Sequence, residues 1–219
     1  KKGSMTENLG RGLSFLGKLM VSYNRTFFEK LYVTSMAGSS LESTTADNSS
    51  YTSLGFYSDV LGHPNFALGY GGSARPSGTE SLATAAGFFF NGNAIYDNRY
   101  SVDVVYRYEG SSKFGKNTRF APFWSLGTGW NIHNESFLKG SPFQLLKLRA
   151  SVGYLGNISF EPYQALTMYT YLNGYNYIKG IGAVPMGIGN TNLRWERTLS
   201  GNVGLDLTML KGRWDFSAD

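Results

Sequence analysis

The sequence from 146 to 154 reads Leu146-Lys147-Leu148-Arg149-Ala150-Ser151-Val152-Gly153-Tyr154, a strict alternation of apolar and polar residues. In a β-strand successive side chains point to opposite faces, so the apolar residues would share one face and the polar residues the other. A helix has a period of about 3.6 residues and would mix the two groups. The segment therefore predicts a β-strand with one face that avoids water and one that seeks it.

Other segments repeat the same alternation along the chain. Residues 101–109 set valines and tyrosines against Ser, Asp, Arg and Glu, and residues 199–209 set Leu, Val and Met against Ser, Asn, Asp and Thr. Weaker copies occupy residues 15–23, 31–44, 82–96, 123–132 and 213–218. We therefore expect an all-β fold of about eight antiparallel strands.

The length of these strands and their aromatic ends favour a membrane location. Many are around ten residues long, whereas strands of soluble proteins average about five or six. Aromatic rings gather near strand ends, where amphipathic rings would lie at the membrane surface. They are Tyr23, Tyr96, Tyr106, Tyr108, Trp130, Tyr154, Trp195 and Trp214. We interpret the chain as part of an antiparallel transmembrane β-barrel.

The connections between strands alternate in length, as they do in outer-membrane barrels with short periplasmic turns and long extracellular loops. The links at 25–30, 97–99 and 210–212 are short, that at 110–119 is intermediate, and those at 45–81 and 156–192 are long. The 133–145 link departs from this pattern, and residues 134–140 within it predict a short helical turn. We expect the two long links to be extracellular loops.

Composition argues against several other classes. The 219 residues include 28 Gly and only 16% charged residues, against about 25% in globular domains. No apolar run reaches the roughly 18 residues of a membrane-spanning helix. Lys and Arg are scattered although the net charge is +5, so nucleic-acid binding is not expected. The first residues lack the apolar segment of a signal peptide, which predicts an internal piece or a mature N-terminus.

Four ordered motifs carry a family resemblance. They are the segments 108–120, 123–130, 146–157 and 190–198, the last followed by Asn-Val-Gly-Leu-Asp at 202–206. In this order they resemble the SusC/RagA family of TonB-dependent outer-membrane transporters. Glu109, Trp124 and Thr191 stand where that family more often has Asp, Pro and Pro.

The resemblance implies a Gram-negative outer-membrane barrel of about 22 strands, plugged by a separate N-terminal domain. It also implies import of large nutrients, such as oligosaccharides or peptides. The implied partners are a SusD-like surface lipoprotein, TonB acting through an N-terminal part missing here, and outer-membrane lipid. Residues 1–219 would be an internal portion of the barrel domain, without the plug domain.

Substrate contact is the one binding role that the sequence suggests. Aromatic rings can stack on sugars or pack against a partner. The loop expected outside carries five tyrosines, Tyr163, Tyr169, Tyr171, Tyr175 and Tyr177. Packing within the loop is the competing interpretation. The charged residues expected to face the lumen would either tune an electrostatic path or pair across strands. These are Asp103, Arg107, Lys147, Arg149 and Asp206.

Catalytic, metal and cofactor sites are not expected. His63 and His133 are the only histidines and there is no cysteine, which disfavours a zinc site. No serine lies in a Gly-x-Ser-x-Gly elbow, and the glycine-rich segments 69–73 and 180–182 lack the Lys-Ser or Lys-Thr of a phosphate loop. Two alternatives to a transporter remain open: a complete small barrel acting as an adhesin or structural protein, and a soluble β-sandwich binding module.

Overall fold

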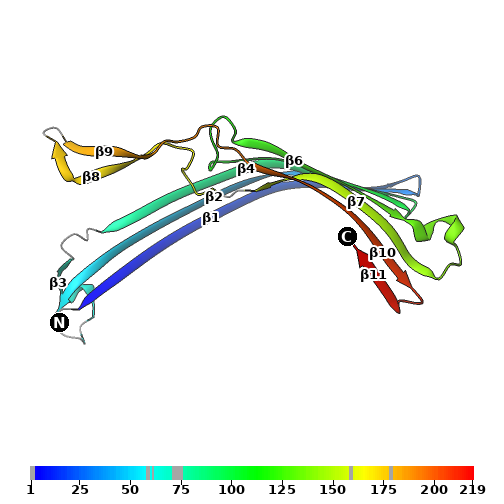
Figure 1. The fold of residues 1–219 in the computed structure, drawn as a ribbon, viewed down its shortest axis with the longest axis horizontal. Helices are drawn as coiled ribbons and strands as arrows, with labels where there is room; N and C mark the ends of the chain where they lie inside the picture. The colour runs from blue at the N-terminus through cyan, green and yellow to red at the C-terminus, as the bar shows by residue number, and fades with distance from the viewer. Residues whose placement is uncertain (1–2, 58–59, 61, 71–75, 158–159, 178–179) are drawn as a thin grey trace. The chain divides into compact units, whose positions relative to one another are not determined.

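The computed structural model describes residues 3–57, 60, 62–70, 76–157, 160–177 and 180–219, with backbone only for 173–177 and Ile181. Strands dominate these residues (Figure 1). The strands are β1 (Ser4–Phe27), β2 (Leu31–Phe56), β3 (Ala67–Tyr70), β4 (Ser77–Tyr96), β5 (Tyr100–Ser111), β6 (Phe120–Asn131), β7 (Phe143–Asn157), β8 (Met168–Tyr177), β9 (Gly180–Gly187), β10 (Glu196–Met209) and β11 (Trp214–Ala218). Three 3₁₀ turns accompany them, η1 (Pro64–Phe66), η2 (Ile132–Asn134) and η3 (Ser136–Leu138).

The main sheet follows the order β1-β2-β4-β5-β6-β7-β10-β11, with β3 paired to β2. Neighbouring strands pair antiparallel, for example β5 with β6 and β7 with β10. Strands β8 and β9 form a separate two-stranded sheet. The predicted all-β antiparallel fold is therefore confirmed. None of the described residues belongs to a helix with the length and apolar character needed to cross a membrane.

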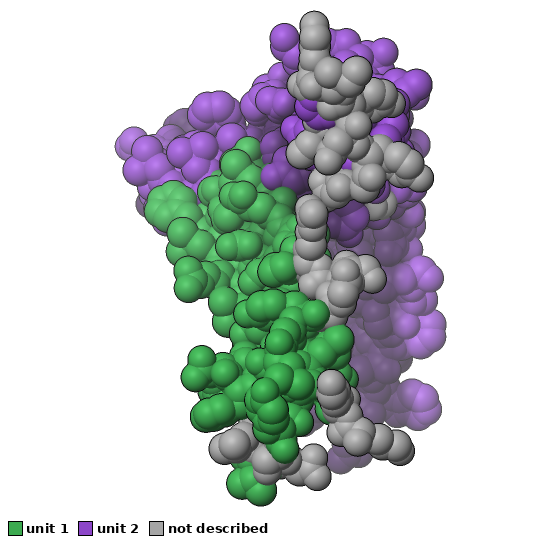
Figure 2. Space-filling model, turned by 90° about the vertical axis from the view of Figure 1, so that its left-hand side faces the viewer, with its two compact units in different colours: residues 1–16, 42–84 green, residues 17–41, 85–219 purple. Residues whose placement is uncertain are grey.

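The chain divides into two compact units, coloured separately in Figure 2. Unit 1 comprises residues 1–16 and 42–84, and unit 2 comprises residues 17–41 and 85–219. Unit 1 contains the beginning of β1, the end of β2, β3 and the start of β4. Unit 2 contains the remaining strands and every functional candidate that the sequence suggested.

The predicted link 45–81 is shorter than expected. Strand β2 continues to Phe56 and β4 already begins at Ser77. Residues 45–56 are rich in Ser, Thr and Asn, which mark loops when read from sequence. Here they pair across strands within unit 1 through hydroxyl and amide groups. The pairs are Thr6–Thr52 at 2.9 Å and Ser50–Asn8 at 2.7 Å.

The predicted link 156–192 also contains strands that the sequence did not reveal. Within it β8 and β9 pair as a hairpin, with Tyr169 opposite Pro185 and Tyr171 opposite Ala183. The register shifts between Met168 and Tyr169, so the ladder is irregular. Glycines in both strands weaken the alternation from which strands are recognised. The extracellular position of both long links stays a prediction.

The three short links are confirmed as tight turns. Two of them carry two consecutive residues with positive φ, the arrangement of a type I′ turn, which matches the twist of the flanking strands: Phe28 and Glu29, and Asp97 and Asn98. The third has four residues between the paired Met209 and Trp214, with positive φ at Leu210, Lys211 and Gly212. The helical turn expected at 134–140 is present as η2 and η3, with Glu135 between them.

Unit 2 has one apolar sheet face and almost no interior. Val104 pairs with Leu126, which in turn pairs with Val152, so apolar residues line one face across β5, β6 and β7. These three side chains are 39–40% exposed. Among the described residues only five hydrophobic side chains are buried: Phe114, Ala121, Phe123, Ala165 and Trp195. The sheet therefore presents its apolar face outward instead of covering it with a second layer.

Candidate functional site

The polar face of unit 2 carries charges that pair across strands. The Arg149 guanidinium on β7 lies 2.9 Å from the Asp206 carboxylate on β10, and 2.7 Å from that of Asp219. On β5 the Asp103 carboxylate accepts a hydrogen bond of 2.6 Å from the Asn93 amide on β4. Pairing, the competing interpretation of these charged residues, is therefore found for Asp103, Arg149 and Asp206. Arg107 pairs within its own strand, 2.5 Å from the Glu109 carboxylate.

Glycines give this polar face its depth. A Cβ atom on Gly204 would lie 2.9 Å from the Arg149 guanidinium carbon, and one on Gly129 would lie 3.3 Å from Cε of Lys147. The long Arg149 and Lys147 side chains therefore lie over glycines, where a larger residue would collide with them. The same face has a hollow of about 250 Å³ lined by residues of β5, β6, β7 and β10, including Asp103 and Lys147. This face can hold water and polar solutes.

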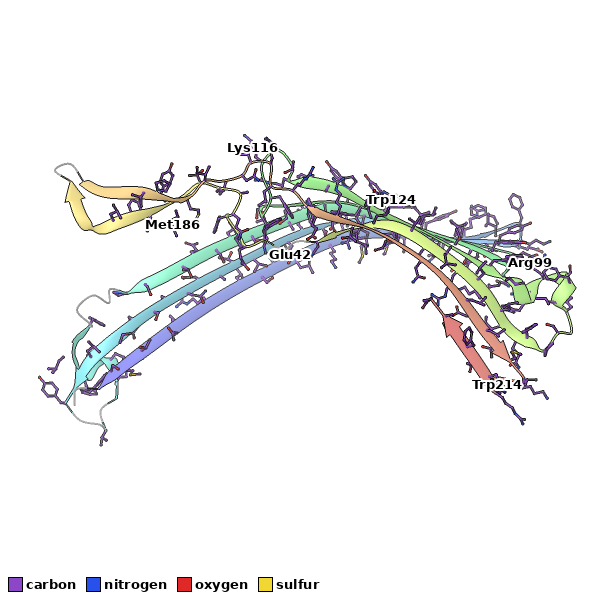
Figure 3. The ribbon with its side chains drawn as sticks, in the orientation of Figure 1. Glu42, Arg99, Lys116, Trp124, Met186 and Trp214 are labelled. Atoms are coloured by element: carbon purple, nitrogen blue, oxygen red, sulfur yellow. The ribbon has the colours of Figure 1, made fainter. Side chains whose placement is uncertain are left out.

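The apolar face carries two rows of aromatic rings, near the two ends of β5. Tyr100 stacks on Trp130 with ring centres 6.4 Å apart, and Tyr108 stacks on Phe120 at 5.5 Å. Trp124, labelled in Figure 3, meets Tyr154 edge-on at 5.8 Å. From Tyr100 to Tyr108 the strand rises about 26 Å at ~3.3 Å per residue. That length is of the order of the apolar band of an outer-membrane barrel.

Trp195 does not belong to these rows, so its predicted place in a membrane-surface girdle is wrong. Its ring is 7% exposed and stacks on Phe114 at 4.4 Å. Phe123 meets the Trp195 ring edge-on at 5.0 Å, and Phe160 meets Phe114 at 6.0 Å. Together with Ala121, these residues form what we call the aromatic cluster. It packs the segment after β5 against the segment before β10.

Backbone contacts close the aromatic cluster. Gly115 N–H donates to the Leu193 carbonyl at 2.8 Å, and the Thr118 hydroxyl donates to the same carbonyl at 2.7 Å. The Trp195 indole N–H donates to the Arg119 carbonyl at 3.0 Å. A Cβ atom on Gly115 would lie 2.0 Å from the Thr191 carbonyl oxygen. Only glycine permits this approach, so two motifs far apart in sequence form one structural joint.

A second joint, which the sequence did not predict, surrounds Glu135. Its carboxylate accepts hydrogen bonds from the Tyr100 hydroxyl at 2.6 Å and the Trp130 indole at 3.1 Å. The Arg99 guanidinium, labelled in Figure 3, lies 3.3 Å away. We call these four residues the Glu135 cluster. A single glutamate between two helical turns gives no sequence signal of its partners.

The surroundings of Glu135 stabilise its charged form. The hydrogen bonds from Tyr100 and Trp130 lower the pKa of the Glu135 carboxyl, and the nearby Arg99 charge acts in the same direction. Burial opposes them by raising that pKa, but the net direction is downward. The carboxylate therefore stays ionised at neutral pH, where it accepts from both donors. The cluster joins the 97–99 turn to the connection between β6 and β7.

The five predicted substrate-contacting tyrosines separate into three groups. Tyr169 and Tyr171 are alternate residues of β8, and their side chains are 63% and 68% exposed. Tyr163 has a positive φ of 71° and lines a hollow at the base of the β8–β9 hairpin. Tyr175 and Tyr177 belong to β8 but lie outside the residues whose side chains are described.

The hollow beside Tyr163 was not predicted from sequence. It has a volume of about 330 Å³, and it lies between the segment before β8 and the end of β9. Its walls are mainly apolar and include Leu166, Met168, Met186 and Ile188. Leu166 and Met168 alternate on one side of the hairpin, and Met186 and Ile188 alternate on the other. This alternation could indicate the hollow, but the neighbouring glycines make it hard to recognise in the sequence.

The histidines serve local structure. The His63 ring accepts a hydrogen bond of 3.2 Å from the Asn65 backbone N–H, and the His133 ring accepts one of 3.3 Å from that of Leu146. In the parts of the chain that the structure describes, no three His, Asp or Glu residues gather closely enough to hold a metal ion.

A family model described as the TonB dependent receptor-like β-barrel matches residues 5–219. A TonB-dependent receptor of Formosa agariphila is 30% identical over 215 residues, which is 97% of this chain and 20% of that protein. The TonB-dependent receptor SusC of Bacteroides thetaiotaomicron is 36% identical over 137 residues, 59% of this chain and 14% of SusC. The chain thus spans about a fifth or less of these relatives.

Solved structures give the same result. The RagAB peptide importer in its closed-closed state superposes with a TM-score of 0.88 and 26% identity, covering 99% of this chain and 24% of the other. The RagAB peptide transporter superposes with a TM-score of 0.87 and 27% identity over 97% of this chain and 23% of the other. The resemblance to SusC/RagA proteins that the four motifs carry is therefore confirmed.

Proposed function

We propose a function on the premise that this chain belongs to the TonB dependent receptor-like β-barrel family. In this proposal the chain forms part of the wall of a transporter in the outer membrane of a Gram-negative bacterium. The apolar face of unit 2 contacts lipid, and the polar face borders the passage through which large nutrients enter. The family match favours this role over a soluble sandwich module or a small independent barrel.

One observation carries the proposal, namely the two-faced sheet of unit 2. Val104, Leu126 and Val152 are half-exposed on one face, between rows of aromatic rings. An apolar face of this extent is costly in water, but it is favourable in hydrocarbon. The opposite face carries Asp103, Lys147 and Arg149 around a hollow. Charged residues of this kind belong on the lumen side of a barrel wall.

The remaining parts of the transporter lie outside this chain in the proposal. A plug domain would close the barrel, TonB would act on that plug, and a SusD-like lipoprotein would cover the outer opening. Oligosaccharides and peptides are the substrate classes that the SusC/RagA resemblance implies. RagAB, which superposes on nearly the whole chain, is a peptide importer. That similarity favours peptides for this protein.

Neighbouring residues of β7 allow a direct test of the two faces. Ser151 is on the polar face and Val152 on the apolar face, and residues 1–219 contribute no cysteine, so the unaltered complete receptor gives the background of labelling. In the complete receptor in outer membranes, Ser151→Cys should react with a small charged thiol reagent and Val152→Cys should not. Equal labelling of both variants would contradict the proposed orientation of the wall.

Transport itself is tested by uptake in cells that express the complete receptor. Labelled peptides and oligosaccharides should enter only when TonB and the proton gradient are intact. Deletion of the TonB gene is the matched control, because it leaves the barrel in place. Uptake that persists at full rate without TonB, or no uptake of either class, would contradict the transporter assignment.

A further inference from the structure

We infer that the hollow at the base of the β8–β9 hairpin is a subsite for one apolar side chain of a transported peptide. The inference rests on the proposed function and adds to it a position and a chemical class of substrate. The hollow is lined by Pro162, Tyr163, Leu166, Met168, Met186 and Ile188. All of these residues belong to unit 2, and their side chains are described.

The two backbone segments beside the hollow contact each other directly, and the Met186 and Ile188 side chains on its rim are 69% and 91% exposed. The Gly189 N–H donates to the Thr167 hydroxyl at 3.1 Å. A Cβ atom on Gly189 would lie 2.4 Å from the Leu166 carbonyl carbon, so the two backbones are in direct contact there. Beneath this contact Ala165 is only 5% exposed. A preformed site avoids the entropy of ordering loops on binding.

The size of the hollow fits a single side chain together with part of its backbone. Its volume is about 330 Å³. The hollow is open on the side of Ile188, which is 91% exposed, so it would cover only one face of a bound group. A stable contact between two proteins needs about 800 Å² on each partner, which is far more surface than this hollow offers. The geometry therefore points to one residue of a ligand instead of a partner's docking face.

The chemistry of the lining selects an uncharged, apolar group. Besides the Gln164 amide and the Tyr163 hydroxyl, the lining side chains offer carbon and sulfur, and none carries a charge. A sugar would bring several hydroxyl groups, and each hydroxyl buried without a partner costs free energy. An aliphatic or aromatic side chain loses nothing of this kind and gains by leaving water. Methionine side chains also adapt their shape to different guests.

The experiment measures binding of two labelled peptides to the complete receptor in detergent. Both have the same Gly-Ser-rich sequence, with either one leucine or one serine at the centre. The unaltered receptor should prefer the leucine peptide. The Leu166→Ser and Met186→Ser variants should bind it about tenfold more weakly and bind the serine peptide unchanged. The matched control is Val184→Ser on β9, since Val184 does not line the hollow.

Three outcomes would overturn the inference. One is the absence of leucine preference in the unaltered receptor, and another is an equal loss for both peptides in the Leu166→Ser variant. The third is unchanged peptide binding combined with loss of a co-purifying lipoprotein, which would assign the hollow to a partner. TonB-dependent uptake that survives these outcomes leaves the proposed function intact. If uptake of peptides and oligosaccharides is absent in the unaltered receptor, the proposed function itself is wrong.

Discussion

The aromatic cluster and the Glu135 cluster join chain segments at opposite ends of β5 by different chemistry. The aromatic cluster follows the C-terminal end of β5 and packs Phe114 against Trp195. The Glu135 cluster contacts Tyr100, the first residue of β5, and uses one carboxylate with three donors. The first joint depends on burial of apolar area, and the second on a charge.

The two clusters show two ways in which the connections between strands can be stabilised in a sheet that has almost no interior. Connections between strands cannot pack on a core that the described residues do not provide. Each connection must therefore obtain its stability from its own contacts. Phe114 is 1% exposed and Glu135 is 7% exposed, while many strand residues between them are half-exposed. These two buried side chains lie near opposite ends of the strands, where the connections are held.

Trp195→Ala should have the largest effect. The substitution removes the ring that joins Phe114 and Phe123 and opens a cavity in the aromatic cluster. We expect a loss of about 3–5 kcal/mol of unfolding free energy, measured by thermal unfolding of the complete receptor in detergent. Trp124→Ala is the control, since Trp124 is 39% exposed. Equal destabilisation by the two variants would show that the cluster is not a distinct joint.

Gly115→Ala should follow, because it acts on the backbone side of the same joint. The added methyl group would collide with the Thr191 carbonyl and force the two segments apart. We expect about 1–3 kcal/mol of destabilisation in the same unfolding experiment. Gly201→Ala is the control, because a Cβ atom there would meet its nearest atom at an ordinary 3.8 Å. An unchanged unfolding temperature in Gly115→Ala would contradict the proposed close approach.

Glu135→Gln should have a smaller, pH-dependent effect. The pKa of the Glu135 carboxyl is lowered in the folded state, chiefly by the Tyr100 and Trp130 hydrogen bonds. Its stabilisation is therefore complete above the ordinary glutamate pKa of 4.5 and is lost as the pH falls through the lowered value. Unfolding temperatures measured across this range should fall more steeply for the unaltered receptor than for Glu135→Gln. If the unfolding temperatures of the two proteins changed in parallel with pH, the Glu135 charge would not contribute to stability as proposed.

Arg149→Met should have the smallest effect on stability. Arg149 pairs with Asp206, yet its side chain is 38% exposed, and exposed ion pairs contribute little. The unfolding temperature should match that of Lys147→Met, a neighbouring charge on the same face. A shift in unfolding temperature as large as that of Glu135→Gln would contradict this expectation. It would mean that the exposed Arg149–Asp206 pair stabilises the protein as much as the buried Glu135 carboxylate.

Sequence alternation predicted the sheet but not its joints. The 146–154 segment pairs with β6 and β10 with its apolar residues on one face, as expected, because a period of two is a local property. The ends of β1 and β2 escaped prediction, since Ser, Thr and Asn form strands there only through partners on the neighbouring strand. The position of Trp195 near a strand end predicts a place at the membrane surface, and its contact with Phe114, which is distant in sequence, cannot be read from that position.

Substrate contact by the five tyrosines stays a prediction. Tyr169 and Tyr171 lie exposed on β8, and Tyr163 lines the hollow, but the sequence does not predict the strand that carries the first two. The sequence also does not show that Leu166 and Met186 lie close together, because their proximity depends on the hairpin register and on the Gly189 contact. Proximity of this kind depends on how the segments pack in the folded chain, so no single sequence segment reveals it.

The outward apolar face also bears on how such a protein can diverge. In the proposed orientation Val104, Leu126 and Val152 face lipid, and liquid hydrocarbon accepts an apolar side chain of almost any shape, so selection there acts on hydropathy and not on fit. The backbone can then persist while most of the sequence changes, as the TM-score of 0.88 at 26% identity illustrates. In that orientation substitutions should accumulate fastest on the apolar face and slowest at residues such as Gly115 and Trp195, which hold the aromatic cluster together.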